Sequence, residues 1–255
     1  QVGGRRALRT WMAMAAHGAL RGRALRLAAG ALLLAAAYTA SDAPGAGAGS
    51  CAAGSGPGCG ESGGLWAVLA EDERAELWSV LQDEAVSRLD ELGKVSDTEG
   101  SLTRTYLSPA YLRAVALLAR WMRDAGLRTW VDGLGNVHGR LEGTDPSLPA
   151  LYVGSHFDTV VDAGRFDGTM GVIVPIAAVK ALRRSGRAPV RSVELVAWCD
   201  EEGVRYGSTF LGSRALAGQF PFHWLDNVDR EGITMRQAIV AAGLAEPGGG
   251  EEAVK

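Results

Sequence analysis

Three short segments of the sequence carry acidic and imidazole side chains that could perform hydrolytic chemistry. The first, Ser-His-Phe-Asp-Thr, contains His156 and Asp158; the second, Phe-Asp-Gly, contains Asp167; the third is Asp200-Glu-Glu-Gly203. A mixture of imidazole nitrogen and carboxylate oxygen suits divalent ions such as Mn²⁺ and Zn²⁺. A carboxylate can bridge two ions about 3.5–4 Å apart, and one of two adjacent glutamates can act as general base on water. Together the segments predict a two-metal hydrolytic site.

Buried strands are predicted directly before the first and third of these segments. Residues 150–155 form a mostly apolar run that ends at His156, and residues 193–198 form a second run that ends at Asp200. The largely apolar stretch 168–182 is long enough for a helix between them. In open α/β sheets, ligands bind outside the carboxyl ends of the strands. The two polar clusters are therefore expected to meet at one end of a sheet.

The remaining elements also alternate between helix and strand. Apolar residues recur at helical spacing over 77–92, and a second helix is expected to begin at Ser108 and Pro109 and to stop at Gly126. Residues 127–132 and 136–141 are typical of a hairpin, and 211–216 and 234–242 of short helices. This order predicts an α/β sandwich rather than an all-β fold.

The chain begins with a segment that has the pattern of a targeting leader. Arginines but no acidic residues occur in 1–41, and the apolar run 27–37 is followed by small and polar residues. This pattern predicts a signal peptide over 1–42 and entry into the secretory pathway, with an organellar transit peptide as the alternative. The run is shorter than the roughly 20 apolar residues that a stable membrane span needs. Residues 43–64 are expected to be a flexible linker, 65–244 a folded domain and 245–255 a flexible tail.

Composition excludes some partners. The 255 residues are 47% hydrophobic and 22% charged, with a formal net charge of −3. The part expected to fold has no basic stripe interleaved with aromatic residues, so nucleic acid is a poor candidate. The composition suits one sizeable core and a small-molecule substrate.

The three segments resemble the signature blocks of the M20 metallo-aminoacylase and carboxypeptidase family, and their spacing is similar to that of its amidohydrolase branch. The resemblance implies a three-layer α/β/α sandwich with a central mixed sheet, and the family's lid and dimerisation domain is absent from this sequence. It implies that His156 and Glu202 each ligate one of two ions and that Asp167 bridges both. Glu201 would be the general base, and Asp158 would hold the imidazole of His156.

Further segments are similar to the plant-type allantoate amidohydrolases. They include Thr129-Trp-Val-Asp132, Gly135-Asn-Val-His-Gly139, Glu201-Glu-Gly-Val-Arg205 and Thr209-Phe-Leu-Gly-Ser213. This similarity implies cleavage of the carbamoyl (ureido) C–N bond of allantoate to give ureidoglycine, ammonia and carbon dioxide. It also implies two divalent ions, Mn²⁺ in preference to Zn²⁺, a homodimer of the full-length enzyme, and association with the endoplasmic reticulum.

That family completes its metal site with two later histidines, and neither is found in this sequence. The histidines besides His156 are His17 in the leader, His138 in a strand and His223 in a loop. Each ion would keep two protein ligands, whereas most such sites have three or more. We therefore expect the chain alone to be an inactive fragment that binds metal weakly.

Other functions remain open. One is an N-carbamoyl-L-amino-acid or ureidoglycolate hydrolase with the same metal chemistry, and another is a peptidase, which the segment after the paired glutamates disfavours. A third is a non-catalytic remnant that acts as an interaction module. For Arg205 an ion pair with a neighbouring acid is expected, with contact to a substrate anion as the alternative.

Overall fold

The computed structural model describes residues 71–245. The expected leader at 1–42 and linker at 43–64 lie outside these residues, as does nearly all of the expected tail. Within the described part, no helix combines the length and the apolar character needed to cross a membrane.

The expected helix over 77–92 is present, with a local change of winding. It consists of α3 (Glu71–Trp78), the π-helical turn η3 (Ser79–Glu84) and α4 (Ala85–Leu92), and the junction residues keep helical backbone angles. The apolar positions Leu77, Leu81 and Ala85 are four residues apart, and this spacing fits an α-helix as well as a π turn, so the pattern did not reveal the change of winding.

Helix α5 (Pro109–Asp124) begins as expected. Ser108 has an extended backbone and its hydroxyl accepts a hydrogen bond from the Tyr111 amide, while proline occupies the first helical position. After the helix, Gly126 adopts a φ of +78°, which a residue with a Cβ adopts only at a cost. The chain can then turn directly into the sheet.

The sheet has four described strands and mixed direction. They are β1 (Arg128–Val131), β2 (Val137–Leu141), β3 (Leu151–His156) and β4 (Val193–Trp198), in the order β1-β2-β4-β3. Strand β2 pairs antiparallel with both β1 and β4, and β3 pairs parallel with β4. The expected hairpin, both further strands and the mixed α/β character are thus confirmed. Strand β4 is buried as expected. The prediction that β3 is also buried is wrong, because β3 lies at the edge of the four described strands, none of its residues is buried, and Tyr152 is half exposed.

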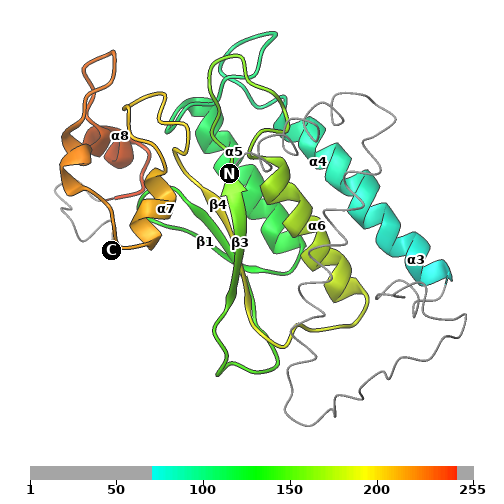
Figure 1. The fold of residues 1–255 in the computed structure, drawn as a ribbon. Helices are drawn as coiled ribbons and strands as arrows, with labels where there is room; N and C mark the ends of the chain where they lie inside the picture. The colour runs from blue at the N-terminus through cyan, green and yellow to red at the C-terminus, as the bar shows by residue number, and fades with distance from the viewer. Residues whose placement is uncertain (1–70, 246–255) are drawn as a thin grey trace, which may run out of the picture.

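Helices flank the strands in Figure 1. Helix α6 (Met170–Arg184) connects β3 to β4 and packs with α5 on one side of the sheet. The short helices α7 (Leu211–Leu216) and α8 (Met235–Ala241), with the 3-10 turn η4 (Phe222–Asp226) between them, lie on the other side. The buried core runs from the N-terminal helices through α5 and α6 to the inner residues of β4.

The parallel pair of strands fixes the place of the polar segments. His156, the last residue of β3, is in register with Trp198, the last residue of β4. Both strands therefore end at the same edge, and the loops that follow them must meet there.

Candidate metal centre

His156 is the centre of the polar cluster at this edge. Its Nε2 lies 3.9 Å from a carboxylate oxygen of Asp167 and 3.8 Å from one of Glu201. Its Nδ1 lies 3.1 Å from the backbone carbonyl of Asp158. If that carbonyl accepts the Nδ1 proton, Nε2 is left with a lone pair directed at the carboxylates, as a metal ligand requires.

The structure brings two of the expected metal ligands, His156 and Glu202, close to the expected general base Glu201, whereas the expected bridging ligand Asp167 is not part of this group. One ligand atom from each of His156, Glu201 and Glu202 lies within 4.8 Å of the other two, and this is the metal-compatible group found among the described residues. Asp167 approaches from the loop before α6, and its side chain is 57% exposed. One imidazole and three carboxylates fit a borderline divalent ion, and the exposed carboxylate leaves a side open to a second ion or to substrate.

The charges of the cluster favour a cation. Burial alone would lower the pKa of His156, but the hydrogen bond and charge of Asp158, with the charge of Glu201, raise the pKa to about 9. Burial raises the pKa of Glu202; the charge of His156 opposes this shift, and the negative charges of Glu201 and Asp167 add to it. The carboxylates therefore repel one another, and a bound cation would relieve that repulsion.

Asp158 connects the two loops of the site. Its buried carboxylate accepts hydrogen bonds from the amides of Glu201 and Glu202, both at 3.1 Å, through its two different oxygens. The nearer carboxylate oxygen is 3.7 Å from Nδ1 of His156, whereas the backbone carbonyl is closer. Asp158 thus holds the imidazole mainly through its main chain, and its side chain orients the paired glutamates.

Asp200 has a role that the sequence pattern did not reveal. It is a non-glycine residue at φ +43°, and its buried carboxylate accepts a hydrogen bond from the Ser208 hydroxyl. Burial, followed by the charge of Asp158, raises the pKa of Asp200 to about 8. Asp200 is therefore mostly protonated at neutral pH. Its positive φ turns the chain directly before Glu201 and Glu202.

Gly168 is the second residue whose role sequence reasoning missed. Its φ is +62°, and a Cβ placed on it would lie 2.5 Å from Cε1 and Nε2 of the His156 ring. The backbone of the Phe-Asp-Gly segment therefore packs directly against the imidazole. The glycine in that segment was the available signal, because both features exclude a side chain.

The other residues considered from the sequence lie outside the cluster. Arg205 pairs with Asp229 at 2.9 Å, which confirms the expected ion pair. His138 is buried, stacks on Trp130 and lies 3.1 Å from Asp132, as expected of a structural residue.

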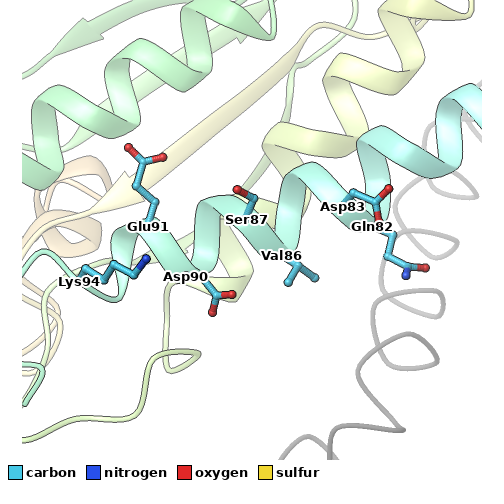
Figure 2. Close-up of a pocket in the computed structure, with 7 residues that line it drawn as sticks. All are labelled: Gln82, Asp83, Val86, Ser87, Asp90, Glu91 and Lys94. Atoms are coloured by element: carbon cyan, nitrogen blue, oxygen red, sulfur yellow. The ribbon is translucent and has the colours of Figure 1, made fainter.

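A hollow along α4 is a weaker candidate for a functional site. Figure 2 shows side chains that spread from one helix and the turn after it rather than converging on a common point. The residues that line it are Gln82, Asp83, Val86, Ser87, Asp90, Glu91 and Lys94. None of them belongs to the cluster around His156.

Known proteins are similar to the part of the chain that contains this cluster. The model of peptidase family M28 matches residues 136–232, which include His156, Asp167, Glu201 and Glu202; the sequence motifs had suggested family M20. Allantoate deiminase 1 of Glycine max is 52% identical over 171 residues, which are 66% of this chain and 35% of that protein. An N-carbamoyl-L-amino acid amidohydrolase of Geobacillus stearothermophilus is 41% identical over 158 residues, 62% of this chain and 39% of that protein.

A solved structure of an amidase has a similar fold. A crystal structure of a hydantoinase/carbamoylase family amidase from Burkholderia ambifaria matches with a TM-score of 0.60 and 34% identity, covering 63% of this chain and 40% of that one. The chain spans about a third of the length of the plant relatives, 35% for the Glycine max protein. It is a homologue of the plant allantoate deiminases and corresponds to part of their length.

Proposed function

We propose that the protein is a metal-dependent amidohydrolase that cleaves the carbamoyl C–N bond of allantoate, giving ureidoglycine, ammonia and carbon dioxide. The observation that carries the proposal is the cluster of His156, Glu201 and Glu202 at the ends of β3 and β4. It occurs in a chain that is 52% identical to an allantoate deiminase over 171 residues.

The proposal gives each side chain of the cluster a role. His156 and Glu202 would each hold one of two divalent ions, Mn²⁺ in preference to Zn²⁺, and Asp167 would lie between the ions. When bound, the ions would polarise the carbamoyl carbonyl and lower the pKa of the attacking water. Glu201 takes a proton from that water and delivers it to the leaving nitrogen, and the released carbamate then loses carbon dioxide.

Hydrogen bonds within the loops after β3 and β4 hold the residues of the proposed metal site in place. Asp158 fixes the directions of Glu201 and Glu202 through their amides, and its carbonyl fixes the ring of His156. General base catalysis requires that Glu201 be held in a fixed position, because a base must lie within hydrogen-bond reach of the proton that it removes.

Three substrates test the proposal. Ammonia release from allantoate, an N-carbamoyl-L-amino acid and ureidoglycolate would be measured in Mn²⁺ with the protein at its natural length, and with Glu201→Gln as the control. Preference for allantoate supports the proposal, whereas preference for another substrate identifies the alternative hydrolase. No ammonia from any of the three, with Mn²⁺ bound, would favour the non-catalytic interaction module.

The remaining parts of the proposal concern completeness, assembly and location. The 255 residues alone should be inactive because they offer each ion two ligands, and the full-length enzyme should be a homodimer. The leader at 1–42 should carry the protein to the endoplasmic reticulum. Residues 1–64 fused to a fluorescent protein would test this, since accumulation in another organelle would indicate a transit peptide.

A further inference from the structure

Arg104 connects the N-terminal helices to the loop that follows β3, and its side chain is fully buried. Its Nη1 donates hydrogen bonds to the carbonyls of Leu92 and Val95, both at 2.9 Å. Leu92 is the last residue of α4, and Val95 belongs to the turn after it. One end of the guanidinium is therefore fixed to the terminus of a packed helix.

The other side of the same guanidinium reaches the loop that follows β3. Nε donates a hydrogen bond of 2.7 Å to the carbonyl of Phe157, the residue between His156 and Asp158. The backbone of Arg104 also holds the loop, because its amide donates to the Thr159 hydroxyl at 2.8 Å and its carbonyl accepts from the Thr159 amide at 3.0 Å. Arg104 thus contacts the loop on both sides of Asp158.

Asp158 transmits this restraint to the site. The peptide between Phe157 and Asp158 is the one whose carbonyl Arg104 binds, and the next carbonyl, that of Asp158, lies 3.1 Å from Nδ1 of His156. The carboxylate of Asp158 also accepts the amides of Glu201 and Glu202. A rotation of this one peptide would therefore disturb the imidazole and the paired glutamates together.

The charge of Arg104 acts in the same direction. Burial lowers its pKa to about 10, and the charge of Asp158 opposes that lowering, so the guanidinium remains protonated at neutral pH. The positive charge of Arg104 attracts the buried carboxylate that accepts the two glutamate amides. Capping the end of α4 would not by itself need a charged group, because neutral donors or water can bind helix carbonyls.

We propose that Arg104 is a positioning residue for the metal centre, which orients the ring of His156 by holding Phe157 and Thr159 on either side of Asp158. This inference rests on the proposed function, because the orientation of the ring matters to the reaction only if His156 holds a metal ion.

The test compares Arg104→Met and Arg104→Lys with Arg88→Met in the protein at its natural length. Arg88 is also buried, but it pairs with Glu84 and Asp124 on helices away from the loop, so it controls for the loss of a buried arginine. Lysine keeps the charge without the planar donor pair of arginine, and it provides a milder variant if the methionine variant does not fold.

Two readouts separate positioning from stability. In the metal-free protein, the imidazole NMR signals of His156, assigned with His156→Gln, report the environment of the ring. The dissociation constant for Mn²⁺ is then measured by calorimetry. We expect both Arg104 variants to shift the His156 signals and to weaken Mn²⁺ binding by about 10–100-fold, the usual effect of removing a residue that orients a ligand. Arg88→Met should change neither.

Folded Arg104 variants that match Arg88→Met in both readouts would overturn the inference. If the unmutated protein binds no Mn²⁺, the proposed function fails, but the His156 signals still decide whether Arg104 positions the ring.

Discussion

Gly168 packs so closely against His156 that replacing it with alanine should weaken metal binding far more than it weakens the fold. The added Cβ would lie 2.5 Å from two atoms of the imidazole ring, Cε1 and Nε2, and 2.6 Å from Cδ2. Normal contact between such atoms begins near 3.5 Å, so the ring must move by about 1 Å.

The size of the two effects follows from different physical terms. A left-handed backbone costs a residue with a Cβ roughly 1–2 kcal/mol, and Gly168 has a φ of +62°. The ring of His156 can rotate away from the clash, which adds little to that cost. Metal–ligand distances, however, hold to about ±0.2 Å, so a displacement of about 1 Å removes the ligand. We expect the affinity for Mn²⁺ to fall at least about tenfold.

A matched control is available within the chain. Gly186 has a φ of +69°, and no atom lies within 4 Å of the position that its Cβ would occupy. Gly186→Ala therefore has the backbone cost without the clash. Denaturant unfolding of the metal-free proteins should give similar losses of stability, while calorimetric titration with Mn²⁺ should separate the two variants.

Equal Mn²⁺ affinity in Gly168→Ala and Gly186→Ala would refute this reasoning. It would mean either that His156 is not a ligand or that the Phe-Asp-Gly segment moves away at little cost.

Further predictions concern the acids around His156. Glu201→Gln should lower kcat for ureido hydrolysis by roughly 10²–10⁴-fold with KM nearly unchanged, since it removes the general base; kinetics of ammonia release would show this, and a normal kcat would contradict the role. Asp158→Asn should bring the pKa of His156 down from about 9 towards its ordinary value in an NMR titration of the metal-free protein, and an unchanged titration would argue against Asp158 as the cause. Because a metal must displace the His156 proton, Mn²⁺ binding at pH 7 should release about one proton, measurable by calorimetry in buffers of different ionisation enthalpy. Asp200 has a pKa of about 8 in the folded protein, so stability should decrease as pH rises from the ordinary aspartate pKa to 8, because the unfolded chain loses that proton first. Asp200→Asn should flatten this decrease in denaturant titrations, and the same slope in both proteins would count against the buried, protonated acid.

Much of the fold could be predicted because each element is encoded locally. The apolar run 193–198 coincides with β4, and the expected helix at 211–216 coincides with α7. Ser108 before Pro109 predicted the start of α5, because the hydrogen bond that caps the helix joins residues only three positions apart. The meeting of His156 with Glu201 and Glu202 also followed from strand order, because parallel neighbours end at one edge.

The parts that could not be predicted depend on contacts between distant segments. Arg104 binds the carbonyl of Phe157 across 53 positions of sequence, and no local pattern encodes that contact. Asp158 was expected to hold His156, but the atoms that do so were not evident from residue types. Its carboxylate binds the amides of Glu201 and Glu202 instead, because the loops after β3 and β4 lie side by side.

The most direct test of His156 as a metal ligand is to locate a metal ion in crystals of the protein at its natural length, grown with saturating Zn²⁺ and measured at the zinc absorption edge. We predict an anomalous peak about 2.0–2.2 Å from Nε2 of His156 and from carboxylate oxygens of its neighbours. His156→Gln crystals should lose that peak. A protein that turns over allantoate while its zinc lies elsewhere, or that shows no peak at His156, would contradict the proposal that His156 is a metal ligand.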